Sequence, residues 1–290
     1  MKGEAGILVL GGRGRLGRAV LEQAGEEAVA APSLGRPAGA QEAAEGFQEL
    51  AGFIRRQEPR LVINCLGYTA VDRAQDEADL ARELNARGPA QLARACAEAG
   101  AQLVHVSTDH VFDGRLRRPY REDDPPAPLS VYGRSKLEGE RAVAAACPSA
   151  LVVRSAWFFG PGRPGFVEKV LRAARRGVPV PVVEDQWGSP TYTRDLARAL
   201  LDLGRRRVGG LLHVVNSGRA SRYELARQAL RLAGLDPELV RPVASSQVPG
   251  AELRPAWTVL DTRRYARLAG GPLPTWLEAL ERYLTGDKEA

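Results

Sequence analysis

Cysteine is scarce in this sequence. The 290 residues include only three cysteines, Cys65, Cys96 and Cys147. Three widely separated thiols exclude a disulfide framework and a cysteine zinc cluster. Each stands in an apolar or alanine-rich stretch, which is typical of a small buried hydrophobic residue. We therefore expect reduced cysteines and assign no metal ligands.

Long hydrophobic runs are also missing. No uninterrupted apolar stretch approaches the roughly 20 residues that a bilayer-spanning helix needs. The first residues, MKGEAG, lead directly into a short apolar segment, so we recognise no signal peptide. From these absences we expect a cytoplasmic protein that does not act at a membrane.

No block of charge of one sign is present. The net charge is +6, but the basic residues are scattered among acidic ones. That distribution gives little support to nucleic-acid binding and suits a small substrate that carries phosphate groups. The hydrophobic content of 44% and the charged content of 26% are ordinary for a globular enzyme or binding protein.

Short apolar segments alternate with amphipathic helical patterns in the first half of the chain. The expected strands are Ile7–Leu10, Ala28–Ala31, Leu61–Cys65, Leu103–Val106 and Leu151–Arg154. The expected helices are Gly14–Ala24, Phe47–Gln57, Asp79–Ala99 and Val131–Ala145. This alternation predicts an α/β protein with a doubly wound parallel sheet.

The alternation loosens after about residue 160. Expected there are strands at Val180–Val183 and Leu211–Val215, and helices near Phe166–Arg176, Thr193–Gly204 and Ser221–Ala233, separated by proline-rich joints. We predict one domain over residues 1–160. A smaller C-terminal lobe should lie mainly within residues 161–290, with some segments returning to the first domain.

A glycine-rich turn follows the first expected strand. The stretch LVLGGRGRLGRAV carries Gly11, Gly14 and Gly17, a spacing that differs from the commoner G-x-G-x-x-G. Such glycines allow a sharp turn and a close approach of backbone N–H groups to a pyrophosphate. The following helix adds the positive end of its dipole. Although glycines also serve ordinary turns, this position favours a dinucleotide site in a Rossmann-type domain.

The segment after the second expected strand bears on the choice of cofactor. NAD-preferring sites usually place an acid there to bind the ribose 2′-hydroxyl. Here no acid precedes Glu42, whereas Arg36 follows the strand and Arg13 lies in the glycine turn. Arginine without a competing carboxylate suits a 2′-phosphate, which favours NADPH and leaves NADH as the alternative. Arg36 could equally be a solvated loop residue.

Tyr132 and Lys136, in VYGRSKLEGE, are about one helical turn apart, and Thr108 closes an expected strand. The pair could be an ordinary helix surface, but ligands in open α/β sheets bind beyond the strand ends. Reducing a carbonyl needs a hydride from nicotinamide and a proton for the developing alkoxide. Since a free tyrosine has a pKa of about 10, a lysine beside it would stabilise the phenolate and lower that pKa.

The glycine triplet, Thr108 and the Tyr132-x-x-x-Lys136 motif together resemble the extended short-chain dehydrogenase/reductases. This resemblance implies that Tyr132 is the acid/base, assisted by Thr108 and Lys136, and that Lys136 also holds the nicotinamide ribose. Asn85 matches a family asparagine, or is a structural polar residue on its helix. The expected cofactor contacts are Gly11, Arg13, Gly14, Arg15, Leu16, Gly17, Arg36, Cys65, Leu66, Gly67, Tyr132 and Lys136.

Further motifs narrow the resemblance. They are TAVDRAQDE, STDHVFDG, PLSVYGRSKLEGE, VVRSAWFFG, EDQWGSPTY and RPAWTVLDTRR, which span nearly the whole chain in this order. In that order they resemble the dTDP-4-dehydrorhamnose reductase family. The resemblance implies reduction, by NAD(P)H, of the 4-keto group of dTDP-4-dehydro-L-rhamnose to dTDP-L-rhamnose.

The same resemblance implies a set of substrate contacts. They are Thr69, Val71, Ser107, Thr108, His110, Arg154, Trp157, Gln186 and Arg254. An indole suits the apolar face of a deoxysugar, and arginine suits a diphosphate. His110 departs from the tyrosine that the family usually carries there, and could bond to the sugar or only fill space. LGYTAVD replaces the small alanines that the family prefers, although Leu66 and Gly67 still allow a cofactor to approach.

Two other functional classes stay open. One is a non-catalytic relative, similar to the regulatory subunit of methionine adenosyltransferase, that keeps the dinucleotide site and binds a partner protein. The other is an epimerase or dehydratase of another nucleotide sugar. A dehydratase would carry glutamate where this chain has His110, and the retained Thr108, Tyr132 and Lys136 favour catalysis. The sequence leaves open whether the chain forms a homodimer.

Overall fold

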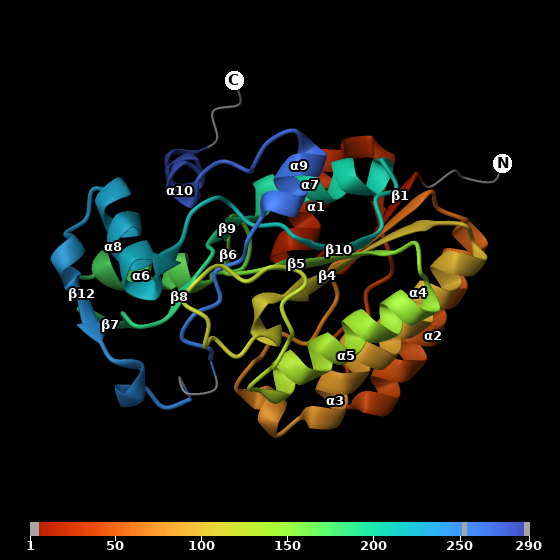
Figure 1. The fold of residues 1–290 in the computed structure, drawn as a ribbon, viewed down its shortest axis with the longest axis horizontal. Helices are drawn as coiled ribbons and strands as arrows, with labels where there is room; N and C mark the ends of the chain where they lie inside the picture. The colour runs from red at the N-terminus through yellow and green to blue at the C-terminus, as the bar shows by residue number, and fades with distance from the viewer. Residues whose placement is uncertain (1–5, 251–253, 287–290) are drawn as a thin grey trace.

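The computed structural model describes residues 6–250 and 254–286. Its centre is a six-stranded sheet in the order β10-β5-β4-β3-β1-β2 (Figure 1). Every pair of neighbouring strands runs parallel. The strands are β1 (Ile7–Leu10), β2 (Ala28–Ala30), β3 (Leu61–Asn64), β4 (Gln102–Thr108), β5 (Leu151–Ser155) and β10 (Gly210–His213).

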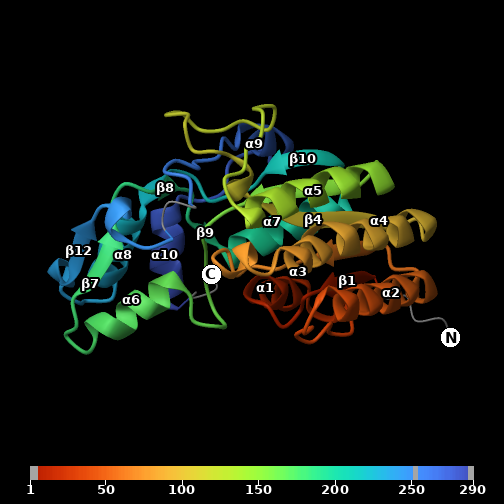
Figure 2. The same cartoon turned by 90° about the horizontal axis from the view of Figure 1, so that it is seen from below.

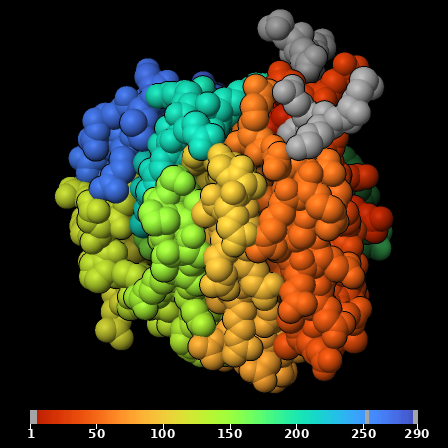
Figure 3. Space-filling model, turned by 90° about the vertical axis from the view of Figure 1, so that its right-hand side faces the viewer, coloured from red at the N-terminus to blue at the C-terminus, as the bar shows by residue number. Residues whose placement is uncertain are grey.

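Helices cover both faces of this sheet. One layer contains α1 (Arg15–Ala24), α7 (Thr193–Arg205) and α9 (Arg263–Ala269), and the other contains α2 (Ala40–Gln57), α4 (Gly88–Glu98) and α5 (Val131–Ala146). Figure 3 looks onto α5, α4 and α2, which form adjacent rows in green, yellow and orange. The predicted doubly wound α/β fold is therefore confirmed.

The alternation of side chains along a strand explains the two apolar layers. Ile7 and Val9 of β1 pack in the core beneath α1 and α7, whereas Leu8 and Leu10 pack in the core beneath α2. Successive strand residues point to opposite faces, so a sheet covered on both faces needs continuous apolar runs. Complete burial of each such side chain is worth about 1.5–3 kcal/mol.

The expected helix Asp79–Ala99 consists of three pieces. They are α3 (Ala78–Arg82), the π-helical turn η3 (Glu83–Arg87) and α4. Pro89, near the start of α4, has no N–H to bond to the carbonyl oxygen of Asn85 four residues earlier. The π turn lies where a regular helix would need that bond. Helix α2 also begins earlier than expected, at Ala40.

The smaller lobe packs beside the sheet domain (Figure 2). Its core lies between α6, α8 and α10 and short strand pairs. The elements of the lobe are β6 (Phe158–Phe159), α6 (Phe166–Ala174), β7 (Val180–Val183), β8 (Trp187–Gly188), β9 (Thr191–Tyr192), β11 (Ala220–Ser221), α8 (Arg222–Leu232), β12 (Val240–Val243) and α10 (Trp276–Thr285).

Short 3-10 turns occur in both parts of the molecule. They occupy Gly25–Glu27, Arg73–Gln75, Asp109–Val111, Pro237–Leu239 and Ser245–Gln247.

The chain crosses between the two parts several times. Elements α7, β10 and α9 follow residue 160 in sequence, yet β10 pairs with β5 and both helices pack on the sheet core. The lobe is therefore made of several segments, the first of which begins at β6, and they alternate along the chain with elements of the sheet domain.

Replacing Gly139 by alanine is expected to destabilise the protein. A Cβ at this position of α5 would lie 1.9 Å from the backbone oxygen of Asn85, so α5 and the π turn would have to move apart. Overpacking of this kind costs about 1–3 kcal/mol, which urea unfolding would show as a lower midpoint. Gly271→Ala is the control, because nothing lies within 4 Å of a Cβ there. Equal stability of the two variants would contradict this packing.

Candidate active site

A cleft of about 1220 Å³ opens at the carboxyl ends of β1, β3 and β4. Its walls are the turn Gly11–Gly17, Ala30 at the end of β2, residues 31–33, 35 and 36 after that strand, the turn Cys65–Thr69, and side chains from β4 and α5. Ligands of open parallel sheets bind at this end of the strands. The predicted cofactor contacts therefore all line one cleft, together with Ser107 and Thr69 from the predicted substrate set.

The glycines of the first turn are required by close contacts. Gly11 has a φ of 78°, in the left-handed region that favours glycine. A Cβ on Gly17 would lie 2.3 Å from the backbone oxygen of Gly11, so only glycine lets α1 pack this closely on the turn. Helix α1 then begins at Arg15 with its N-terminus at the cleft, where backbone N–H groups and the helix dipole favour a phosphate.

The lining of the cleft is positively charged. Five of its residues are basic, and none is acidic; the basic residues are Arg13, Arg15, Arg36, Lys136 and Arg163. Such a cleft attracts anionic ligands such as the phosphates of a dinucleotide. Arg15 is partly engaged, since it pairs with Glu168 of α6 at 3.2 Å and donates to the Phe158 carbonyl at 3.3 Å. It therefore links the glycine turn to the smaller lobe.

Helix α5 brings Tyr132 and Lys136 into the cleft. Its N-cap Ser130 accepts a hydrogen bond from the Gly133 N–H at 3.1 Å, which fixes the first turn. The Lys136 ammonium donates to the Val106 carbonyl of β4 at 2.7 Å. Burial lowers the pKa of Lys136 to about 8, while the Glu140 carboxylate opposes that shift. The lysine is thus mostly charged at neutral pH.

The pKa of the Tyr132 phenol is raised, whereas the sequence predicts a lowered one. Burial raises its pKa to about 12, a hydrogen bond with Thr108 lowers it in part, and Asp109 raises it again. The expected lowering by Lys136 is absent, because that ammonium is directed at Val106. The His110 ring meets the Tyr132 ring edge-on at 5.4 Å. In this environment Tyr132 keeps its proton, as a proton donor must.

Asn85 connects the turn after β3 to α5. Its side-chain oxygen accepts from the Tyr68 N–H at 2.9 Å, and its amide donates to the Ser135 hydroxyl at 2.9 Å. A Cβ on Gly67 would lie 2.9 Å from that oxygen. Asn85 lines the cleft, but its bonds within the protein give it a structural role in positioning the Tyr68 turn against α5.

Arg154 is directed into the protein interior. It is 3% exposed and binds both oxygens of Glu140, at 2.9 and 2.7 Å. The Ser107 hydroxyl donates to the same carboxylate. The expected substrate contact of Arg154 thus finds no support in this geometry. The alternation along β5 could have indicated this, because Arg154 lies on the same face as Val152, which packs under the α5 layer.

Trp157 stands where the sheet domain meets the lobe. It has a φ of 48°, which is strained for a residue with a side chain. A Cβ on Gly188 would lie 2.4 Å from its indole, so glycine there leaves room for the ring. The guanidinium of Arg222 lies 3.6 Å from the ring centroid. Strain of this kind persists only where the surroundings hold it, and it often marks a functional position.

The other predicted substrate residues come from several segments of the chain. Thr69 is exposed at the cleft, and Val71 follows it in a tight turn, with its N–H bonded to the Thr69 carbonyl at 3.1 Å. Arg254 pairs with Asp72 at 2.8 Å. Gln186 is buried, and its backbone carbonyl accepts from the backbone N–H of Arg222 at 3.1 Å.

Sequence reasoning missed Arg222, Asp109 and Arg163. Arg163 lines the cleft, and Asp109, 2% exposed, has a buried side-chain oxygen without a hydrogen-bond partner. Arg222 reaches Trp157 only through tertiary packing, so no spacing in the sequence could have found it. Asp109 could have been found, since it lies between Thr108 and His110 at the end of β4.

Neither a metal cluster nor a membrane helix is found in the part of the chain that the structure describes. Within residues 6–250 and 254–286, no group of three or more histidine, cysteine, aspartate or glutamate side chains could hold a metal ion. Over the same residues, no helix has both the length and the apolar character needed to cross a membrane.

The parallel sheet, the glycine turn after β1 and the Tyr132 and Lys136 side chains at one cleft, with Thr108 hydrogen-bonded to Tyr132, define a dinucleotide-binding fold of the short-chain dehydrogenase/reductase type. The model of the RmlD substrate binding domain family matches residues 5–288, and the chain belongs to this family. This membership confirms the resemblance drawn from the sequence motifs.

Individual relatives of known name support this family assignment. The chain is 48% identical over 225 residues to a dTDP-4-dehydrorhamnose reductase from Mycolicibacterium smegmatis, which covers 76% of this chain and 68% of the relative. The crystal structure of a Clostridium acetobutylicum dTDP-4-dehydrorhamnose reductase has a TM-score of 0.86 and 35% identity, covering 96% of this chain and 98% of that one. The Bacillus anthracis dTDP-4-dehydrorhamnose reductase in complex with NADP has a TM-score of 0.86 and 31% identity, covering 97% and 99%.

Replacing Arg154 by methionine is expected to destabilise the fold, because Glu140 would be left buried without its cation. Breaking a buried ion pair in this way costs about 3–5 kcal/mol, measurable as the free energy of unfolding in urea. The double variant Glu140→Gln, Arg154→Met removes the buried charge as well and should recover much of the loss. A single variant as stable as the wild type would show that the pair does not hold α5.

Proposed function

We propose that this protein is a dTDP-4-dehydrorhamnose reductase, which reduces the 4-keto group of dTDP-4-dehydro-L-rhamnose with NADPH to give dTDP-L-rhamnose. One observation carries the proposal. In a chain of this family, Tyr132 and Lys136 lie at the cationic cleft that begins at the glycine turn, and Thr108 is hydrogen-bonded to Tyr132. A carbonyl at that point would meet both a proton donor and the reduced cofactor.

The residues of the cleft fit a dinucleotide. The close turn at Gly11 and Gly17 and the N-terminus of α1 suit a pyrophosphate. A bound nicotinamide would supply the hydride. The Lys136 ammonium uses one donor on the Val106 carbonyl and keeps two others, which can bind ribose hydroxyls.

Tyr132 is the proton donor in this proposal. As negative charge develops on the ketone oxygen, the phenol gives its proton to that oxygen. The pKa of about 12 keeps the phenol protonated until then, and the hydrogen bond with Thr108, which lowers that pKa in part, stabilises the phenolate that results. The Thr108 hydroxyl, bonded to the phenol, orients the ketone oxygen toward it. Because both groups are fixed by β4 and α5, no rearrangement of the protein is needed at the moment of transfer.

The cofactor is proposed to be NADPH. Arg13 and Arg36 line the cleft, and none of the cleft-lining residues is a carboxylate that could accept a hydrogen bond from a ribose 2′-hydroxyl. Two guanidinium groups in such a lining suit a 2′-phosphate. The Bacillus anthracis relative, solved with NADP, supports this choice.

The two other classes considered have less support. Burial lowers the pKa of His110, so its imidazole is neutral at pH 7 and does not replace the carboxylate expected in a dehydratase. A purely regulatory subunit would have no need of a protonated phenol held beside Thr108.

The three cysteines are free thiols, which fits a reducing, cytoplasmic location. A homodimer stays a prediction.

Purified protein should oxidise NADPH when dTDP-4-dehydro-L-rhamnose is added, and Tyr132→Phe should abolish this turnover. The phenylalanine ring keeps the packing but has no proton to donate, so the affinity for NADPH should change little. Loss of nicotinamide absorbance measures turnover, and cofactor fluorescence titration measures binding. Absence of NADPH and NADH oxidation by the wild type would refute the proposed reaction. Full activity of Tyr132→Phe would remove only the role of Tyr132.

Arg36→Ala should weaken NADPH use while leaving NADH use nearly unchanged. Loss of a charge-assisted hydrogen bond of about 1.5–3 kcal/mol corresponds to a roughly 10- to 100-fold higher KM for NADPH. The matched control is Arg18→Ala, since Arg18 is exposed on α1 and does not line the cleft. If Arg36→Ala raises both KM values equally, Arg36 does not recognise the 2′-phosphate.

A further inference from the structure

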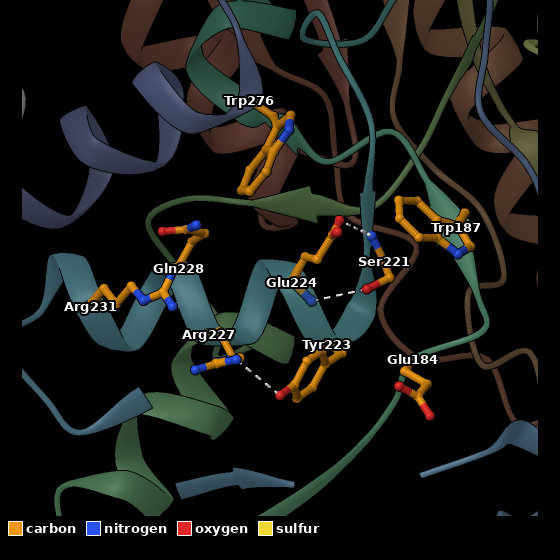
Figure 4. Close-up of a pocket in the computed structure, with 9 residues that line it drawn as sticks. All are labelled: Glu184, Trp187, Ser221, Tyr223, Glu224, Arg227, Gln228, Arg231 and Trp276. Carbon is orange, nitrogen blue, oxygen red and sulfur yellow. Dashed lines mark hydrogen bonds between the residues drawn. The ribbon is translucent and has the colours of Figure 1, made fainter. Parts of the chain in front are cut away.

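Arg222 is the first residue of α8 and lies where the lobe faces the sheet domain. The N-cap Ser221 accepts from the Glu224 N–H at 3.0 Å, and Glu224 accepts from the Ser221 N–H at 3.0 Å (Figure 4). This reciprocal capping fixes the backbone from which Arg222 projects. A cavity of about 560 Å³ lies along another side of α8, and Arg222 is not among its lining residues.

The side chain of Arg222 is stacked between aromatic rings. Its guanidinium carbon lies 3.6 Å from the centroid of Trp157 and 5.2 Å from that of Phe166. Stacking uses the flat face of a guanidinium and leaves its five N–H donors, which lie in the plane, available for a ligand. Among the described residues, its side chain has no hydrogen-bond acceptor and no ion-pair partner.

The surroundings of Arg222 are polar and incompletely paired. Burial lowers its pKa to about 10, with Asp109 opposing this shift and Arg254 adding to it, so both charged groups are near. A side-chain oxygen of Asp109 and the Nδ1 of His110 are buried without hydrogen-bond partners. Arg254 forms an ion pair with the Asp72 carboxylate, whereas Arg222 forms no ion pair with a described residue. Unpaired polar groups of this kind cost free energy unless a ligand binds them.

We propose that Arg222 binds the sugar-bearing phosphate of the substrate, with its guanidinium held by Trp157 so that its donors face that phosphate. The inference rests on the proposed function, because it takes the substrate to be a sugar attached to a nucleoside diphosphate. The family resemblance implies that the sugar packs on Trp157, and the phosphate attached to such a sugar would lie close to the Arg222 guanidinium, which is 3.6 Å from the Trp157 ring centroid. A guanidinium can bind two phosphate oxygens at once. Arg222 would therefore set the distance from the nucleotide to the ketone at Tyr132.

The test compares dTDP with dTMP, which lacks the second phosphate, by calorimetry in the presence of saturating NADP. The wild type should bind dTDP roughly 10- to 100-fold more tightly than dTMP, as expected for a phosphate in charge-assisted hydrogen bonds. In Arg222→Gln this ratio should fall to a few-fold at most. Arg222→Lys, which keeps the charge but not the paired donors, should lie between them. In turnover, the KM for the sugar nucleotide should rise more than kcat falls.

A matched control removes one charge from the same helix. Arg231 is exposed at the end of α8, and Arg231→Gln should keep the wild-type ratio. If Arg222 only supports the Trp157 ring, Arg222→Gln will weaken dTDP and dTMP equally, and the proposal is overturned. An unchanged ratio in a folded Arg222→Gln, or no binding of dTDP by the wild type, would also overturn it. A wild type that binds dTDP but does not oxidise NADPH with the sugar substrate refutes the proposed reaction alone.

Discussion

One buried carboxylate, Glu140, holds helix α5 in place over the sheet. It accepts hydrogen bonds from Ser107 of β4 and from Arg154 of β5, so three elements meet at a single side chain. A carboxylate is buried at this depth only when its charge is compensated. Because Tyr132 and Lys136 are two turns and one turn before Glu140 on the same helix, their position at the strand ends depends on this contact.

Helix α5 also approaches its other neighbours closely. Gly139 lets the helix pack against the Asn85 carbonyl, and Lys136 spans the gap to Val106. Asn85 in turn fixes the Tyr68 turn that borders the cleft. The acid/base pair is thus attached to β4, β5 and the π turn, while the smaller lobe approaches from the opposite side and supplies Arg222 and the room that Gly188 leaves for Trp157. Tyr132 and Arg222 thus come from separate parts of the chain, and the proposed substrate would lie between them.

Electrostatics divides the site into two regions. The cofactor cleft is lined by five basic residues and no acidic one, which suits a ligand of several negative charges. Near Trp157, basic and acidic groups are mixed, and Arg254 is already paired with Asp72. A neutral sugar and one nearby phosphate fit such an environment better than a second dinucleotide would. The two regions meet at Tyr132, where burial raises the pKa of the phenol.

Sequence patterns alone predicted strands β1 to β5 of the sheet, the glycine turn and the Tyr132–Lys136 pair. These features depend on local patterns: continuous apolar runs for strands covered on both faces, a glycine spacing, and two side chains one helical turn apart. Tertiary packing was needed to show that Arg154 binds Glu140, that Lys136 is directed at Val106 and leaves the pKa of Tyr132 high, and that the Arg222 guanidinium lies over the Trp157 ring. Each of these depends on residues far apart in the chain, and their burial and partners exist only once the helices and the lobe have packed.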